Sequence, residues 1–254
     1  MTRIICVASG KGGVGKTTLV SNLGSALAKF GKDVIIVDGN LTTPNLGLHL
    51  GLPLFPVTIH DVLKGKADIR DAIYEHESGF KIIPAGIALS DLRGVDARDL
   101  PNAFLSLLGS ADIIIIDASA GLGREALAAM ESADELLLIT TPDLSSVIDA
   151  LKASKLAETL GTKVTGIVVN RVTGKRHEMS IEDVQRMLGL EVLAQIPEDI
   201  AVHKAVAKRQ AVVSHAPSSR ASHEIKRLAA HIAGLEYRKP RPVSHRLFDL
   251  LLRR

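Results

Sequence analysis

Cysteine and aromatic side chains are scarce in this sequence of 254 residues. The single cysteine, Cys6, excludes an internal disulfide framework and any zinc or iron–sulfur site built from several cysteines of one chain. Aromatic residues make up 3% of the chain and Trp is absent, which disfavours a surface that stacks unpaired bases. Cys6 lies inside an apolar run, so we expect it to be a small core residue rather than a reactive thiol.

Long apolar runs are also missing. No eighteen consecutive apolar residues occur in the chain, so the sequence predicts no membrane-spanning helix. Residues 1–9 lead straight into a glycine-rich loop without the pattern of a signal peptide, and we therefore expect a soluble, cytoplasmic protein. With 254 residues, 46% of them hydrophobic, one α/β domain is the expected organisation.

The formal net charge of +3 is unevenly distributed. Between Glu236 and Arg254, six Lys and Arg residues outnumber two acidic residues, which gives this tail +4 and leaves −1 for the rest of the chain. A nearly neutral body disfavours a DNA-binding face, whereas the basic tail points to an anionic partner for the tail alone.

Short apolar runs without alternation recur along the chain, at residues 4–8, 34–37, 113–116, 136–139 and 166–169. Uninterrupted apolar character is typical of strands that are covered on both faces. Helical patterns lie between and after these runs, at residues 16–30, 123–132, 144–160 and 180–188, and Ser180 with Asp183 forms a capping pair at the start of the last one. Strands that alternate with helices predict a mostly parallel, twisted sheet with helices on both faces.

A phosphate-binding loop follows the first apolar run directly and opens the first helical pattern. The loop consists of Gly10, Lys11, Gly12, Gly13, Val14, Gly15, Lys16, Thr17 and Thr18, and it contains the P-loop spacing of glycines, lysine and threonine. Glycines let backbone N–H groups converge on phosphate oxygens, and the N-terminus of the helix adds positive potential. In such loops the residue at the place of Lys16 neutralises the β- and γ-phosphates, and the hydroxyl at the place of Thr17 binds Mg²⁺. The sequence therefore predicts a P-loop NTPase.

Lys11 is not required by an ordinary P-loop, and a second cation beside Lys16 is repulsive unless more negative charge binds there. The run from Lys11 to Thr18 resembles the deviant Walker A motif of the MinD/ParA family, with archaeal-type MinD proteins as the most similar branch. The resemblance implies an ATPase whose ligands are ATP or ADP and Mg²⁺. It also implies that Lys11 reaches the ATP of a second subunit, so that ATP holds a homodimer together.

Acidic residues end two of the predicted strands. Asp38 follows the run 34–37, and Asp117 follows the run 113–116. Because open parallel sheets bind ligands at the carboxyl ends of their strands, we expect Asp38 and Asp117 to hold Mg²⁺ or its water shell together with Thr17. The resemblance makes Asp117 the Walker B acid and Asp38 the first residue of the switch I segment 38–48. The alternative is that each acid only caps a turn.

Two segments depart from the family pattern. The family usually has aspartate at the place of Asn40, where it orients the attacking water; an asparagine holds water by hydrogen bonds but takes no proton. This difference leaves open whether the chain hydrolyses ATP slowly or only binds it. In the switch II segment 117–121, Ser119 stands where many relatives have proline, whereas Gly121 is retained and its N–H is the expected contact to the γ-phosphate. The candidate catalytic residues are thus Lys11, Lys16, Asp38, Asn40 and Asp117.

Three later segments resemble the same family in order and spacing. Asn170 and Arg171 end the run 166–169, where the family reads adenine. The family's second base-contacting loop is matched by Pro197, Glu198 and Asp199, and residues 140–147 resemble the segment that opens a helix at its dimer face. These similarities cover residues 3–235, and we expect the ATPase domain to be residues 1–235.

A different pattern follows residue 235. Two prolines within 237–242 prevent a helix from continuing, so residues 236–243 are a predicted linker. Residues 244–254, capped by Ser244, form a predicted helix of about 16 Å, too short to cross a bilayer. One side of it carries Leu247, Phe248, Leu251 and Leu252, and its arginines suit an anionic lipid surface. The pattern resembles the membrane-targeting helix that ends MinD proteins; the alternative is a helix packed on the body or on a partner.

The leading functional hypothesis is a switch that dimerises with ATP, binds the inner face of the cell membrane as a dimer and is reset by hydrolysis. Relatives of this kind position division or surface machinery, and an unidentified activating or cargo protein is an expected partner. A membrane-bound ATP scaffold with little hydrolysis is one alternative, because of Asn40. DNA partitioning of the ParA type is a second alternative, which the nearly neutral body disfavours. The branches that carry iron–sulfur clusters need cysteine pairs that this chain lacks.

Overall fold

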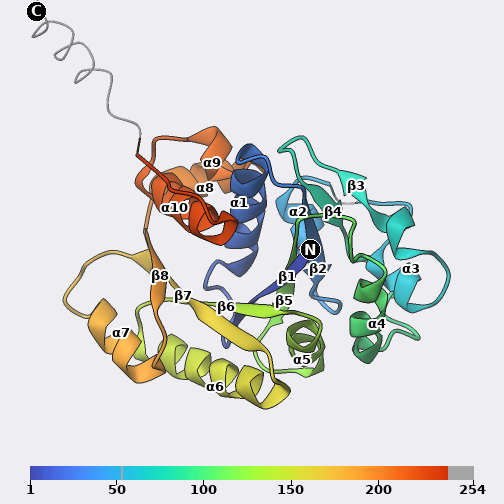
Figure 1. Cartoon of the computed structure of the whole chain (residues 1–254), viewed down its shortest axis with the longest axis horizontal. Coiled ribbons are helices and arrows are strands. Elements are labelled where there is room, and N and C mark those ends of the chain that lie inside the picture. Colours follow the sequence, from blue (N-terminus) through green and yellow to red (C-terminus); the bar gives the residue numbers. More distant parts are fainter. Residues whose placement is uncertain (53, 240–254) are drawn as a thin grey trace, which may run out of the picture.

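Eight strands form one sheet in the order β3-β4-β2-β5-β1-β6-β7-β8. The computed structural model describes residues 1–52 and 54–239 (Figure 1). The strands are β1 (Arg3–Ser9), β2 (Val34–Gly39), β3 (Tyr74–Glu75), β4 (Lys81–Ile83), β5 (Ile113–Ala120), β6 (Glu135–Thr140), β7 (Lys163–Val172) and β8 (Val192–Pro197). Every neighbouring pair is parallel except β3 with β4, so the prediction of a mostly parallel sheet is confirmed.

Both faces of the central strands are buried, which explains why the apolar runs do not alternate. In β1, Ile4, Cys6 and Ala8 join the hydrophobic core on one face of the sheet, while Ile5 and Val7 join the core on the other. Each large aliphatic side chain buried in this way stabilises the fold by about 1.5–3 kcal/mol relative to its exposed state. Cys6 is fully buried in this core, as predicted, and burial raises the pKa of its thiol to about 12.

Helices cover the two faces of the sheet (Figure 1). The core on one face contains buried residues of α1 (Lys16–Lys29), α2 (Leu46–His49), α8 (Ile200–Ala207), α9 (Val212–His215) and α10 (Arg220–Ala233). The opposite core contains residues of α3 (Ile59–Leu63), α4 (Leu100–Leu105), α5 (Arg124–Glu131), α6 (Leu144–Leu160) and α7 (Ile181–Leu188), and two short 3₁₀ turns lie at Ile69–Ala72 and Ala97–Asp99. The chain is thus a single α/β domain of the predicted class.

The long predicted helices are present, with ends that shift by at most two residues. Helix α6 has the predicted bounds, and α7 begins after Ser180, whose hydroxyl accepts a hydrogen bond from the backbone N–H of Asp183 at 3.1 Å. The sequence did not predict β3, β4 and β8 or the short helices around them, because these segments lack a clear apolar period.

The sheet topology brings five strand ends to one edge. The carboxyl ends of β1, β2, β5, β7 and β8 lie on the same side of the sheet because these strands are parallel. The phosphate loop follows β1, the residues 197–199 lie at the end of β8, and Asp38, Asp117 and Asn170 lie near the carboxyl ends of β2, β5 and β7. This edge is where open α/β sheets bind ligands.

The C-terminal predictions fall mostly beyond the described part of the chain. Helix α10 ends at Ala233 and is followed by Gly234 in the left-handed conformation, with φ of 69°. The predicted helix 244–254, including Leu247, Phe248, Leu251 and Leu252, lies outside the described residues, as does 240–243 of the linker, and both segments stay predictions. Within residues 1–52 and 54–239, no helix has the length and apolarity needed to traverse a lipid bilayer.

Candidate functional site

The phosphate loop connects β1 to α1, and its backbone conformation requires glycine. Gly13 and Gly15 have φ of 80° and 95°, a region that side chains with a Cβ rarely adopt. A Cβ on Gly10 would lie 2.1 Å from the carbonyl oxygen of Asp149, because α6 packs directly on the loop. The glycines thus let the loop turn tightly into α1. Backbone N–H groups of the loop and of the first turn of the helix are suited to bind phosphate oxygens.

A buried ion pair lies beneath the loop. The Lys16 ammonium donates to Oδ1 of Asp117 at 2.6 Å, and the Thr17 hydroxyl donates to Oδ2 of the same carboxylate at 2.6 Å. The side chains of Lys16 and Asp117 are 9% and 2% exposed. The structure thus brings together Lys16, Thr17 and Asp117, which the sequence proposed as phosphate and magnesium ligands. Each of them is held by another member of the group rather than by solvent.

A second buried carboxylate stands beside Asp117. Asp38 in β2 is the register partner of Asp117 in β5, and both are 1% exposed. Burial, followed by the charge of Asp117, raises the pKa of Asp38 to about 7, although the N–H groups of Leu46 and Asn40 and the charge of Lys16 act in the opposite direction. Two adjacent carboxylates with a threonine hydroxyl are a suitable oxygen donor set for a hard cation such as Mg²⁺.

Asp38, Asp117 and Thr17 are too few to complete the ligand shell of a magnesium ion, so its other ligands have to come from outside the protein. No group of three His, Cys, Asp or Glu side chains gathers anywhere among the described residues to hold a metal by themselves. Mg²⁺ is normally bound by one or two carboxylates together with water and substrate phosphates. Asp38, Asp117 and Thr17 therefore fit a magnesium ion that arrives with a nucleotide.

The switch I segment holds Asn40 in a local turn. The Asn40 amide nitrogen donates to the carbonyl of Thr43, and its Oδ1 accepts from the Thr43 backbone N–H at 3.3 Å and from the Thr43 hydroxyl at 3.1 Å. Thr43 thus engages the Asn40 oxygen and one of the two amide N–H groups, which leaves the second N–H to bind a water molecule or a ligand. A water-positioning role for Asn40 stays a prediction.

The switch II segment is closed in a similar way. Gly121, with φ of 86°, donates its backbone N–H to the carbonyl of Ser9 at 3.0 Å. The N–H that the sequence assigns to the γ-phosphate is therefore already paired. The Thr42 hydroxyl also donates to the Glu125 carboxylate, which links switch I to α5, the helix that follows switch II.

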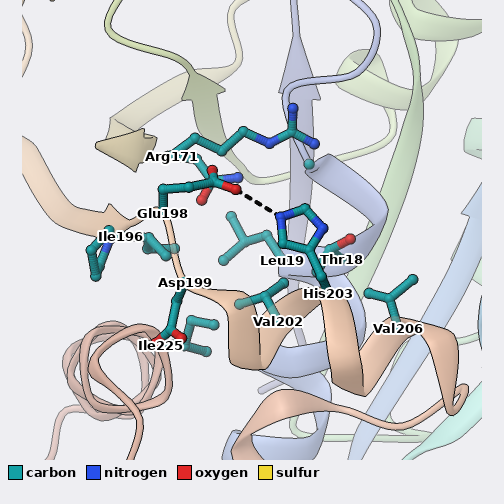
Figure 2. A pocket seen from close by; sticks show the side chains of 13 residues that line it. Thr18, Leu19, Arg171, Ile196, Glu198, Asp199, Val202, His203, Val206 and Ile225 are labelled. Atoms are coloured by element: carbon teal, nitrogen blue, oxygen red, sulfur yellow. Dashed lines mark hydrogen bonds and ion pairs between the residues drawn. The ribbon is translucent and has the colours of Figure 1, made fainter. Parts of the chain in front are cut away.

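A largely apolar pocket of about 180 Å³ lies between β7, β8, α1 and α8 (Figure 2). Leu19, Ile196, Val202 and Ile225 supply its apolar walls, and Figure 2 shows Glu198 hydrogen-bonded to His203 beside it, at 2.7 Å. All five residues that the sequence proposed for base binding line this pocket, namely Asn170, Arg171, Pro197, Glu198 and Asp199. Asp199 also caps α8 by accepting from the N–H of Ala201 at 2.9 Å.

Asn170 has a defined orientation in this pocket. Its Nδ2 donates to the backbone carbonyl of Val14 at 2.7 Å, which ties the end of β7 to the phosphate loop. A Cβ on Gly15 would lie 2.4 Å from that nitrogen, so the close approach depends on glycine. Because Nδ2 is engaged, Oδ1 is the end of the amide that remains to accept a hydrogen bond from a ligand.

The pocket continues into a second groove of about 520 Å³ above the phosphate loop. Gly15, Thr18, Arg171 and Val206 line both spaces, so the apolar pocket and the phosphate loop belong to one continuous site. The sequence analysis gave no role to three polar residues that line this site: His49, His203 and Arg209. They belong to no recognisable motif, and only folding brings them next to the phosphate loop.

Lys11 lies on the outer side of the loop. Its side chain is 48% exposed and its ammonium is 3.9 Å from the Asp143 carboxylate, which is a long, solvent-screened contact. Asp143 caps α6 through the N–H of Ser146 at 2.9 Å, and the first turn of α6 exposes Leu144 and Ile148. The structure therefore places Lys11 away from the buried pair and next to an exposed apolar surface.

Comparisons with known proteins identify the family of the chain. The family described as the CobQ/CobB/MinD/ParA nucleotide binding domain matches residues 5–212. An uncharacterized ATP-binding protein of Methanocaldococcus jannaschii is 42% identical over 237 residues, which cover 93% of this chain and 90% of the relative. The septum site-determining protein MinD of Thermotoga maritima is 35% identical over 246 residues, covering 92% and 89%. The solved structure of septum site-determining protein MinD with Mg-ADP from Pyrococcus horikoshii has a TM-score of 0.88 at 36% identity, covering 91% of this chain and 96% of that one.

Proposed function

The chain belongs to the CobQ/CobB/MinD/ParA family of nucleotide-binding domains, and from this we propose that it is an ATP-dependent switch that dimerises with ATP and is reset by hydrolysis. It is a MinD/ParA-family ATPase related to the MinD proteins of cell division. One observation carries the proposal: the Lys16–Asp117–Thr17 group lies at the phosphate end of a groove that continues into an apolar pocket. The Pyrococcus relative bound to Mg-ADP supports ATP or ADP with Mg²⁺ as the ligands.

The residues of this chain act on the nucleotide in distinct ways. N–H groups of the loop and the start of α1 bind phosphate oxygens, and Lys16 exchanges Asp117 for the β- and γ-phosphates. Thr17, Asp38 and Asp117 hold the magnesium ion, whose charge offsets that of the phosphates during hydrolysis. When Lys16 and Thr17 release Asp117, the carboxylates of Asp38 and Asp117 are both free to bind Mg²⁺. The magnesium charge would then offset the repulsion between these two carboxylates.

Residues outside the groove support the proposal that two copies of the chain form a dimer. Lys11 is half exposed and only weakly held by Asp143, so it is able to reach the phosphates of a second subunit. Exposed Leu144 and Ile148 at the start of α6 supply apolar surface beside it. The γ-phosphate is expected to draw Gly121 from Ser9 and thereby reorder switch II. These features support a homodimer that forms with ATP.

Membrane attachment is the part of the proposal that concerns residues 244–254. A dimer presents two copies of the predicted helix, and two weak helices bind one surface together because the second docks at high effective concentration. We expect a peripheral protein on the inner face of the cell membrane, with an activating or cargo protein as a further partner. Leu247, Phe248, Leu251 and Leu252 would enter the lipid surface.

Sedimentation with anionic phospholipid vesicles tests the membrane proposal. The full chain should sediment in Mg-ATP and remain mostly in the supernatant in Mg-ADP, because only the dimer presents two helices. Deletion of residues 242–254 should abolish sedimentation and leave the ATP-dependent dimer intact. Equal sedimentation in both nucleotides would contradict the proposal, and equal sedimentation without residues 242–254 would assign membrane binding to the body.

Base selection gives a second expected result. Oδ1 of Asn170 is able to accept a hydrogen bond from the amino group of adenine. At the corresponding place guanine has a carbonyl oxygen, which is also an acceptor and is repelled by Oδ1. Asn170→Ala should therefore reduce the preference for ADP over GDP by about tenfold, the value of one hydrogen bond to a buried partner. Asn45→Ala is the matched control, because Asn45 lines only the phosphate groove and should leave the ratio unchanged. An unaltered ADP/GDP ratio in Asn170→Ala, measured by calorimetry, would remove Asn170 from base selection.

Two other functions are candidates. The contacts that hold Asn40 to Thr43, together with the lack of a carboxylate at position 40, favour a membrane scaffold that keeps ATP bound and hydrolyses it very slowly. ParA-like DNA partitioning is supported by family membership, but residues 1–235 carry a formal charge of −1 and offer little attraction for DNA. Measured ATP turnover distinguishes the scaffold from the cycling switch, and measured DNA binding distinguishes the ParA-like candidate from it.

A further inference from the structure

An arginine occupies an unusual backbone position at the end of α8. Helix α8 ends at Ala207, and the N–H of Gln210 donates to the carbonyl of Ala205 at 3.0 Å, while the N–H of Arg209 donates to Val206 at 2.9 Å. This pair of hydrogen bonds closes the helix through a residue in the left-handed conformation. Arg209 is that residue, with φ of 55°.

Glycine fills the corresponding place in four other helices, whereas α5 is followed by Ser132 and has no left-handed residue there. The residue that closes α1, α6, α7 and α10 in the left-handed region is Gly31, Gly161, Gly189 and Gly234, respectively. A side chain with a Cβ is less stable than glycine there. Arginine at position 209 is therefore less favourable for the turn than glycine would be, which suggests that its side chain has a role of its own.

The two left-handed residues other than glycine lie at the same site. Arg171 and Arg209 are the only ones among residues 1–52 and 54–239, with φ of 57° and 55°. Both line the groove that also contains the phosphate loop. Residues in sparsely populated backbone regions cluster at ligand sites when the surrounding structure holds them. Their occurrence on one groove therefore indicates a shared ligand.

The aliphatic part of the Arg209 side chain packs against the segment that follows α2. A Cβ on Gly51 would lie 2.9 Å from Cδ and 3.3 Å from Cβ of Arg209, so the arginine stem packs on that glycine. Within the described residues, Arg209 forms no ion pair with a carboxylate. Its guanidinium, which is always charged, is thus available to an anion in the groove.

We propose that Arg209 is a direct ligand of the nucleotide's phosphates, a cation additional to Lys16 and Lys11 that reaches the groove from the outer wall. A planar guanidinium is well suited to bind phosphate oxygens through two parallel hydrogen bonds. Arg209 also packs on the segment after α2, which continues switch I, so phosphate binding joins α8 to that segment. The inference rests on the proposed function, because it needs a nucleotide in the groove.

Calorimetric titration with Mg-ADP tests the assignment. Arg209→Asn and Arg209→Gly both keep the left-handed turn and should weaken Mg-ADP binding by about tenfold or more, the value of a charge-assisted hydrogen bond. Lys208→Asn removes an equal charge one residue away, does not line the groove, and should bind Mg-ADP as the natural protein does. With AMP, which has a single phosphate, the loss in the Arg209 variants should be smaller.

The thermal stability of the Arg209 variants shows whether weaker binding comes from a lost contact or from a disturbed fold. Arg209→Gly should raise the thermal midpoint of the nucleotide-free protein by about 2–4 °C, because glycine suits the turn better. A variant that is more stable yet binds Mg-ADP more weakly has lost a contact rather than its fold. Undiminished Mg-ADP binding by both Arg209 variants, or an equal loss in Lys208→Asn, would overturn the assignment. If the natural protein itself did not bind Mg-ADP, the proposed function would fail first.

Discussion

Lys16→Met should abolish tight nucleotide binding and destabilise the protein at neutral pH. Lys16 is the cation that offsets two adjacent buried carboxylates, Asp38 and Asp117, and breaking a buried pair of this kind costs about 3–5 kcal/mol of unfolding free energy. Loss of the charge-assisted contacts to phosphate should weaken Mg-ADP binding by about 100-fold. Calorimetry and thermal unfolding measure the two effects.

The effect of Lys16→Met on stability should depend on pH. The pKa of Asp38 is already raised to about 7, and Lys16 is one of the groups that lower it, so the variant should raise it further. A folded carboxyl with a raised pKa binds more protons than the unfolded chain does, so stability is lost as pH increases through the range between the two pKa values. We therefore expect the variant to be closest to the natural protein below the unfolded pKa of about 4.

Lys11→Met is the matched control for this prediction. It removes a lysine from the same loop, but Lys11 is half exposed and makes only the 3.9 Å contact to Asp143. The nucleotide-free stability and the Mg-ADP affinity of Lys11→Met should stay close to those of the natural protein. If Lys16→Met bound Mg-ADP as tightly as Lys11→Met, the site built around Lys16 would be wrong.

Asn40→Asp should increase ATP turnover by about 100-fold or more, the lower end of the range expected for a positioned general base. Aspartate lacks the amide hydrogen that Asn40 donates to the Thr43 carbonyl, so one of the contacts that hold the turn closed disappears. The carboxylate is also able to accept a proton from the attacking water, which the amide is not. Phosphate release from Mg-ATP in the presence of anionic vesicles is the measurement.

Asn45→Asp provides a matched control for charge. The amide of Asn45 donates to the same Thr43 carbonyl at 2.8 Å, and Asn45 lines the same groove, so the variant adds one negative charge nearby without replacing the water-positioning residue. Because the added charge acts on phosphate binding and not on the water, turnover at saturating Mg-ATP should stay at the natural level in Asn45→Asp. Steady turnover by the natural protein would show that Asn40 suffices, whereas turnover only in Asn40→Asp would favour the scaffold. An Asn40→Asp variant as slow as the natural protein would contradict the role of position 40.

The sequence was sufficient to predict the central sheet and which residues gather at its carboxyl edge. Strands β1, β2 and β5 are continuous apolar runs because both of their faces are buried, so the sequence shows them directly. Asp38 and Asp117 follow two of those runs, and parallel topology brings them into register. Chain order alone therefore predicts that they meet beside the loop that carries Lys16.

Features that depend on contacts between distant or irregular segments were not predictable. The closed state of switch II arises from a hydrogen bond between Gly121 and Ser9, for which neither residue gives a signal. Arg209 lies in a turn where glycine is the usual residue, so the sequence gives no indication of a left-handed turn there. The ATP-dependent dimer and the membrane helix stay predictions from family resemblance.

The molar mass of the natural protein in solution tests the central claim most directly. Light scattering on size-exclusion fractions should give a monomer in Mg-ADP and twice that mass in Mg-ATP, or with a non-hydrolysable ATP analogue if turnover is fast. Lys11→Ala should remain monomeric in both nucleotides while still binding them. A natural protein with the same mass in ADP and ATP would contradict the account, as would a normal ATP-dependent dimer of Lys11→Ala.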